Sequence, residues 1–112
     1  MANPTVAILS ALADPTRLAI VERLRIGERC VSELCVEAGV SQSLISFHLK
    51  VLRDAGLVAG RRSGRTVWYA LDPNGLARLE QFARSLRGRP EPPEDRSRAA
   101  DLETCLQYIN GN

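Results

Sequence analysis

The sequence predicts a mainly α-helical fold with one small β-hairpin, and three observations lead to this prediction. Apolar residues recur at the three-to-four-residue spacing of amphipathic helices. The segment around Gly39 has the composition of a tight turn between helices, and two β-prone runs flank Ser63 and Gly64. The 112 residues, 45% of them hydrophobic, suit one domain with a modest core, and we expect residues 1–87 to form it.

Two helices are expected before residue 28. Val6, Leu9 and Leu12 indicate a first short helix. Asp14 has a side chain that commonly caps a helix, and Pro15 suits the first helical position. A second helix is therefore expected to begin at this point and to end at Gly27.

The next two helices form a predicted helix-turn-helix. The helix over Val31–Ala38 is expected to end at Gly39, because glycine readily adopts the left-handed conformation of a C-terminal cap. Ser41 is expected to cap the following helix, which ends at Gly56. Its apolar stripe should face the core and consists of Ile45, Leu49 and Leu52.

A hairpin is expected directly after this helix. Residues 57–62 and 65–71 are the β-prone runs, and Ser63 and Gly64 are expected to form the two-residue turn between them. We assign Trp68 to the core, because aromatic residues in hairpins usually pack across the strand pair. A helix-turn-helix followed by a hairpin is a winged helix, whose wing is placed to touch the DNA backbone or minor groove.

The remaining residues are expected to form a dimerisation helix and a tail. Pro73 opens a helix whose apolar residues follow a heptad-like spacing, and this stripe is expected to pair with a second copy of the chain: Leu76, Leu79, Ala83 and Leu86. Residues 88–98 are rich in proline and charge and are expected to be a flexible linker. Residues 99–112 are expected to carry a short C-terminal helix.

Positive charge is concentrated on the predicted helix-turn-helix and wing, although the net charge of the chain is only +2. Between residues 41 and 65 only Asp54 is negative, against Lys50, Arg53, Arg61, Arg62 and Arg65. Gln and Ser side chains can hydrogen-bond to bases or phosphates, and cations neutralise phosphates. A surface helix of an ordinary bundle could look similar, but the basic hairpin favours binding to double-stranded DNA through Gln42, Ser43, Ser46, Lys50, Arg61, Arg62 and Arg65.

We expect a cytoplasmic protein without a membrane anchor. No apolar run approaches the length of a membrane span, and the N-terminus lacks the basic region of a signal peptide. Cytoplasmic thiols stay reduced, and the odd number of cysteines, three, does not suit a disulfide framework.

Four segments carry a family resemblance that extends from Leu9 to about Leu86: ADPTRLAIVERL, CVSELC, SQSLISFHLKVLRDAGLV and GRTVWYAL. In order and spacing they resemble the ArsR/SmtB family of bacterial metal-responsive repressors. The resemblance implies a homodimeric winged helix with the first and fifth helices at the interface. It further implies binding to operator DNA that weakens when an inducer binds. His48 lies where relatives often have a histidine, so DNA contact or helix packing is expected of it rather than metal binding.

The cysteines suggest the inducer. The arsenical-resistance repressors of this family carry CVCDLC where this chain has CVSELC, so Cys30 and Cys35 match the outer thiols and Ser32 replaces the middle one. The resemblance implies arsenite or antimonite as the inducer, with no permanently bound cofactor. Trivalent arsenic favours three thiolates, and Cys105 is the remaining candidate unless it is a buried apolar residue.

Helix geometry and other inducers bear on this assignment. Five residues on an α-helix separate Cys30 and Cys35 by about 140°, so one ion can hold both only where the first turn is open. The same thiols could instead bind cadmium, lead or a methylated arsenical, or respond to persulfides and oxidants. Related zinc or nickel sensors generally use His and carboxylate ligands on the fifth helix. That site looks absent here, since residues 73–86 contain no His and Glu80 is their only carboxylate.

An enzyme is not expected. The chain has a single His and no Gly-rich phosphate loop, CxxC pair or zinc-protease motif. A module that binds only proteins is the other alternative, and it would show no salt-dependent operator preference.

Overall fold

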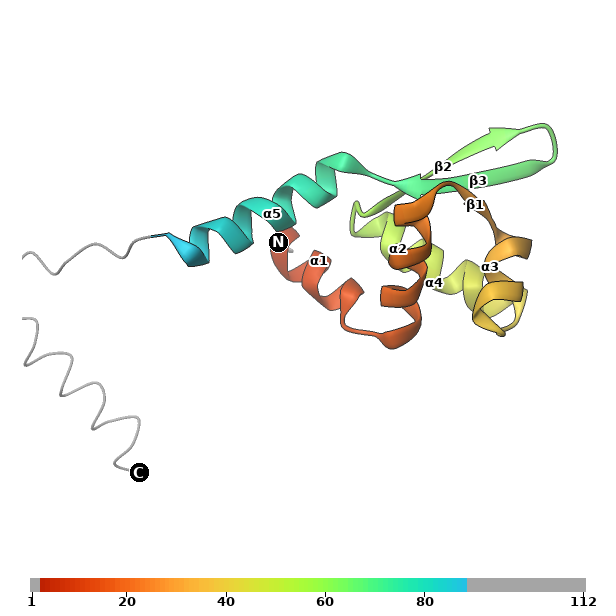
Figure 1. Cartoon of the computed structure of the whole chain (residues 1–112), viewed down its shortest axis with the longest axis horizontal. Coiled ribbons are helices and arrows are strands. Elements are labelled where there is room, and N and C mark those ends of the chain that lie inside the picture. Colours follow the sequence, from red (N-terminus) through yellow and green to blue (C-terminus); the bar gives the residue numbers. More distant parts are fainter. Residues whose placement is uncertain (1–2, 89–112) are drawn as a thin grey trace, which may run out of the picture.

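A computed structural model describes residues 3–88, which form five helices and a three-stranded sheet. The elements are α1 (Pro4–Leu12), α2 (Pro15–Ile26), β1 (Arg29–Cys30), α3 (Val31–Ala38), α4 (Gln42–Asp54), β2 (Val58–Ser63), β3 (Thr66–Leu71) and α5 (Pro73–Arg87). The tip of the β2–β3 hairpin and α3 lie at one end of this body, and α5 extends from the other end beside α1 (Figure 1).

Side-chain caps fix where the helices begin, as the sequence predicted for α2 and α4. The Asp14 carboxylate accepts from the backbone N–H of Arg17, and the Ser41 hydroxyl accepts from that of Leu44. The predicted first helix is α1, which the Asn3 side chain caps and in which Pro4 occupies the first turn. Gly39 ends α3 with a φ of 68°, in the left-handed region that glycine tolerates.

The sheet differs from prediction in two details. Its strand order is β1-β3-β2, and the two-residue strand β1 was not predicted. Because Ser63 pairs with Thr66, the hairpin turn is Gly64-Arg65 rather than Ser63-Gly64, and Gly64 has the positive φ of 63°. The predicted turn was therefore one residue early, since a turn is placed by the register of its strands.

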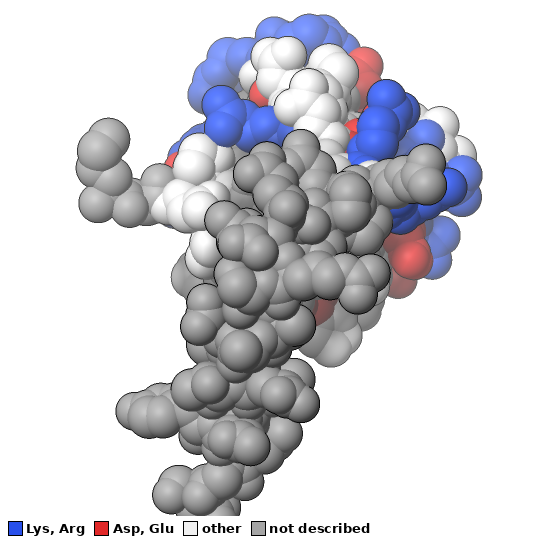
Figure 2. Space-filling model, turned by 90° about the vertical axis from the view of Figure 1, so that its left-hand side faces the viewer, with Lys and Arg blue, Asp and Glu red and all other residues white. Residues whose placement is uncertain are grey.

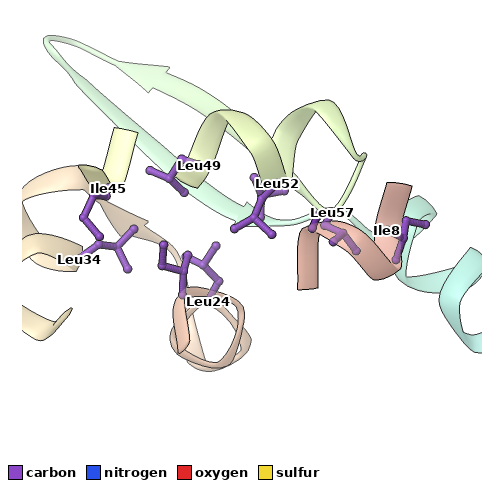
Figure 3. Packing of buried hydrophobic residues seen from close by; sticks show 10 residues of the cluster. Ile8, Leu24, Leu34, Ile45, Leu49, Leu52 and Leu57 are labelled. Atoms are coloured by element: carbon purple, nitrogen blue, oxygen red, sulfur yellow. The ribbon is translucent and has the colours of Figure 1, made fainter. Parts of the chain in front are cut away.

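The core joins the first four helices and the start of β2, as Figure 3 shows for side chains from these elements. Its fully or nearly buried members are Ile8, Ala11, Ile20, Leu24, Leu34, Ile45, Leu49, Leu52, Leu57 and Val58. The predicted stripe of α4 is thus confirmed. Tyr69 and Leu71 of β3 pack against this cluster, and Trp68 is only half-buried. The prediction that Trp68 belongs to the core was wrong, because neighbouring residues of a strand face opposite sides.

Apolar side chains remain exposed on α1 and α5, namely Val6, Leu9 and Leu86. This is the surface on which a second copy was expected. Of the predicted tail, residues 89–98 of the linker and the whole of the short helix over 99–112 lie outside the described residues.

Over residues 3–88, no helix taken alone has the length and apolarity that a bilayer span requires; only α1 and α2 counted together do, across a 96° bend. Ile8 of α1 and Ile20 of α2 are buried in the core.

Candidate DNA interface and thiol site

Helix α4 presents a polar face opposite its buried stripe. Gln42, Ser43, Ser46 and Lys50 are all exposed, as predicted for a helix that enters a DNA groove. Gln42 is the first residue of α4, directly after its Ser41 cap. Short polar side chains near the N-terminus of such a helix can reach base edges in the major groove.

His48 does not lie on this exposed face. Its side chain is buried, and Nη1 of Arg17 donates to its Nδ1 over 3.2 Å. Because Nδ1 accepts this bond, the proton of a neutral ring resides on Nε2. The expectation of DNA contact is therefore replaced by its alternative, helix packing: position 48 follows 45 by three residues and falls on the core side of α4.

The same arginine connects α1, α2 and α4. Nε of Arg17 donates to the carbonyl oxygen of Ala11 over 2.6 Å, while its backbone N–H donates to the Asp14 carboxylate over 3.0 Å. That backbone hydrogen bond, followed by the positive charge of Arg17, lowers the pKa of Asp14 from its ordinary value. The side chain that starts α2 thus stays ionised while Arg17 holds the buried side of α4.

Two predicted DNA contacts already have acidic neighbours. Lys50 Nζ lies 3.2 Å from an Asp54 oxygen, and Arg61 Nη2 lies 3.2 Å from a Glu28 oxygen. Both pairs are exposed, so each contributes little to stability and can give way to a phosphate. The Glu28 contact joins β2 to the segment before β1.

Arg62 and Arg65 are exposed near the tip of the hairpin, and neither forms a salt bridge within residues 3–88. Seen from the α5 end, Lys and Arg occupy much more of the described surface than Asp and Glu (Figure 2). The guanidinium groups of Arg62 and Arg65 are therefore available to neutralise phosphates beside the groove that α4 would enter.

Cys30 lies at the junction of β1 and α3. It is the N-cap of α3, with extended backbone, and so stands outside the helix. Its Sγ lies 3.2 Å from the Ser32 hydroxyl and 3.5 Å from a Glu33 carboxylate oxygen, which also accepts from the Cys30 backbone N–H. The first turn of α3 is thus held by a capping interaction in which the thiol participates.

Cys35 lies five residues further along the chain, within α3, half-buried and packed against the core. Among residues 3–88, no three His, Cys, Asp or Glu side chains come together as a metal site would require. Cys105 lies outside the described residues. The described part of the chain therefore holds two of the three predicted ligands in different surroundings and no preformed site.

An open hollow connects the thiol with the DNA-binding side chains. Its volume is about 340 Å³, and it is lined by Cys30, Val31, Ser32, Gln42, Arg65, Thr66, Val67 and Tyr69. Cys30 therefore shares one surface depression with the first residue of α4 and with the wing tip. A group added to this thiol would enter the space between them.

Two side chains near the interface escaped the sequence prediction. Phe47 is 55% exposed and Leu44 is 41% exposed, although both are apolar residues of α4. The signal was present in the spacing, because Ile45, Leu49 and Leu52 fix the core side and leave position 47 opposite. The contact between Arg17 and His48 could not be read from the spacing of apolar residues, because it joins side chains 31 positions apart.

These features define a class of protein: winged helix-turn-helix regulators, with an exposed polar recognition helix beside a basic hairpin. Residues 14–59 match the model of the family described as "Bacterial regulatory protein, arsR family". A probable mercury resistance operon repressor of Streptomyces lividans is 40% identical over 105 residues, covering 94% of this chain and 78% of that protein. The chain belongs to the ArsR family, whose members are transcriptional regulators and not enzymes.

Two further comparisons agree. The HTH-type transcriptional repressor SmtB of Mycobacterium tuberculosis is 51% identical over 72 residues, which are 64% of this chain. The chain spans only 53% of the length of that relative. A crystal structure described as a possible transcriptional regulator for arsenical resistance superimposes with a TM-score of 0.65 at 43% identity, covering 72% of this chain and 84% of that one.

Proposed function

We propose that the chain is a transcriptional repressor that binds operator DNA as a homodimer in the cytoplasm and leaves it when a thiophilic inducer binds its cysteines. One observation carries the proposal: the helix with the thiols packs directly on the recognition helix. Leu34 of α3 and Ile45 of α4 meet in the core, as Figure 3 shows, and Cys30 shares its hollow with Gln42.

DNA binding divides between base reading and phosphate neutralisation. Gln42, Ser43 and Ser46 supply the donors and acceptors for base edges. The cations that neutralise the backbone are Lys50, Arg61, Arg62 and Arg65. A dimer would place two copies of α4 in successive major grooves, which requires the apolar surface of α1 and α5 to be buried between the protomers.

The proposed inducer is trivalent arsenic or antimony, bound by Cys30, Cys35 and Cys105. The similarity to a possible regulator for arsenical resistance supports this choice. The thiols of α3 do not form a ready site, so an ion that gathers them must disturb the hydrogen bonds of Cys30 with Ser32 and Glu33. Because α3 packs on α4, such binding favours a conformation in which Gln42 and Ser43 are misplaced.

A second candidate is another thiophilic inducer acting on the same segment. The similarity to a probable mercury resistance operon repressor favours a soft metal ion, and that match is long enough to include Cys105. Cadmium and lead belong to the same chemical class. A persulfide or oxidant would need only Cys30, whose modification would fill the hollow beside Gln42 and Arg65.

The test is operator binding titrated with each inducer, using DNA selected by the protein from a random pool. Arsenite, antimonite, mercuric ion, cadmium, lead, zinc and a persulfide are compared for the wild type and for Cys30→Ser, Cys35→Ser and Cys105→Ser. Release by arsenite that is lost in all three variants supports the trithiolate site. Release by a soft divalent ion or by persulfide alone supports the second candidate.

A Ser32→Cys variant is the matched gain-of-function control. It restores the trio of thiols in residues 30–35, and the arsenical proposal predicts that it needs less arsenite for release and no longer needs Cys105. Arsenite that binds the wild type without lowering operator affinity would contradict the arsenical proposal and leave the DNA-binding function intact.

A further inference from the structure

Phe47 is an apolar ring in the middle of the exposed face of α4. It follows Ser43 by four residues and precedes Lys50 by three, so the three side chains form one stripe on the helix. Phe47 is 55% exposed, whereas Ile45 and Leu49 on the core side are at most 1% exposed. Phe47 is therefore not a member of the buried core and stands among the groups that would face the DNA.

The Phe47 ring also contacts the ring of the next residue, His48. Its centroid lies 5.4 Å from that of the His48 ring, in an edge-to-face arrangement with an interplanar angle of 61°. His48 is itself buried and receives the hydrogen bond from Arg17. The Phe47 ring thus has one aromatic contact with a buried neighbour, while more than half of the residue stays accessible to a ligand.

Charge decides what kind of surface can cover this ring. Lys50 is exposed on the same stripe, and the guanidinium groups of Arg62 and Arg65, which form no salt bridge within residues 3–88, are exposed on the wing. An apolar protein partner would bury these cations without compensation, whereas DNA pairs them with phosphates. Within the major groove, the apolar group that a base edge offers is the 5-methyl of thymine, and phenylalanine is among the side chains that contact it.

We infer that Phe47 reads a thymine in each half-site of the operator by packing on its 5-methyl group. The inference rests on the proposed DNA-binding function and deepens it, because it names a base and the group that recognises it. Ser43 and Gln42 then read neighbouring base edges by hydrogen bonds. Specificity at the thymine comes from apolar contact and not from a donor or acceptor.

The test removes the 5-methyl group at one thymine position at a time, in both half-sites of the operator. The thymines of the selected operator are replaced by deoxyuridine in turn, each in both half-sites. Dissociation constants for every substituted operator are measured with the wild type and with Phe47→Ala. At one thymine position the wild type should lose about fourfold per methyl, or about 16-fold for the two half-sites of a dimer. Phe47→Ala should bind both operators with the same, weaker affinity.

Two variants serve as controls. Phe47→Leu keeps an apolar side chain and should retain part of the preference for thymine. Leu44→Ala removes the other exposed apolar residue of α4, and its preference at the same thymine should equal that of the wild type. Urea unfolding of Phe47→Ala checks that the variant folds, as expected for a residue outside the core.

The outcomes separate this inference from the proposed function. Phe47 does not read a methyl group if the wild type binds its operator in a sequence-specific, salt-dependent way but loses no affinity at any deoxyuridine. The same conclusion follows if Phe47→Ala discriminates thymine from deoxyuridine as strongly as the wild type does. If the wild type selects no DNA sequence at all, the proposed function fails together with the inference.

Discussion

The guanidinium of Arg17 donates to Nδ1 of His48 across 3.2 Å and so joins the first turn of α2 to the buried side of the recognition helix. The same side chain holds the carbonyl oxygen of Ala11 at the end of α1. The orientation of α4 thus depends on contacts with two preceding helices as well as on its own apolar stripe. A histidine inside the predicted DNA-reading segment is in this way a structural residue.

His48→Ala should lower the free energy of unfolding by about 1–3 kcal/mol, because it removes a buried ring and leaves Arg17 without its partner. Urea unfolding at fixed protein concentration measures this loss. Ser46→Ala is the matched control on the exposed face, and it should weaken operator binding with little change in stability. Unchanged stability in His48→Ala together with lost DNA binding would return His48 to the set of DNA contacts.

Asp14→Asn should remove part of the acid sensitivity of folding. The pKa of Asp14 is lowered in the folded protein, chiefly by the backbone N–H of Arg17. The resulting stabilisation is present above the unfolded pKa of about 4 and is lost as the pH falls through the lower folded value. Asparagine also caps helices, so the variant should fold at neutral pH. Urea midpoints between about pH 3 and pH 6 should change less with pH in the variant than in the wild type.

Replacing both Arg62 and Arg65 by alanine should weaken binding to specific and nonspecific DNA alike. Each phosphate contact that is lost should reduce the dependence of log K on log salt by about one. Fluorescence anisotropy at several salt concentrations measures this slope. Arg25→Ala, at an exposed position of α2, is the control, and an equal change of slope in that variant would show that the wing does not contact phosphates.

Gly75→Ala should destabilise the domain although alanine favours helices. Gly75 is buried in the first turn of α5, and a Cβ there would overlap the carbonyl oxygen of Gly56. Relieving the overlap must move α5 from the turn after α4, at a cost of about 1–3 kcal/mol. Ala77→Gly, at an exposed position of the same helix, tests the propensity alone. Sedimentation should show a weaker dimer for Gly75→Ala. If urea unfolding instead gave Gly75→Ala the same free energy of unfolding as the wild type, the backbone of α5 would shift without cost.

The secondary structure was largely determined by local sequence. Asp14 and Ser41 mark helix starts because their side chains bond to backbone N–H groups three residues away, and Gly39 marks an end because it accepts a positive φ. The apolar spacing of α4 likewise identified its buried stripe and the residues that are exposed opposite it. These interactions span a few residues, so the sequence displays them directly.

Contacts between distant residues were decided only by the tertiary structure. The pairing of β1 with β3 places Tyr69 rather than Trp68 against the core, and it joins Cys30 to the wing. The packing of α2 on α4 buries His48, while the approach of the hairpin puts Cys30, Gln42 and Arg65 around one hollow. The sequence alone identified a DNA-binding winged helix with thiols beside its recognition helix, because caps, apolar spacing and charge are local. Which side chains those thiols touch depends on strand register and helix packing, which arise from contacts between residues tens of positions apart.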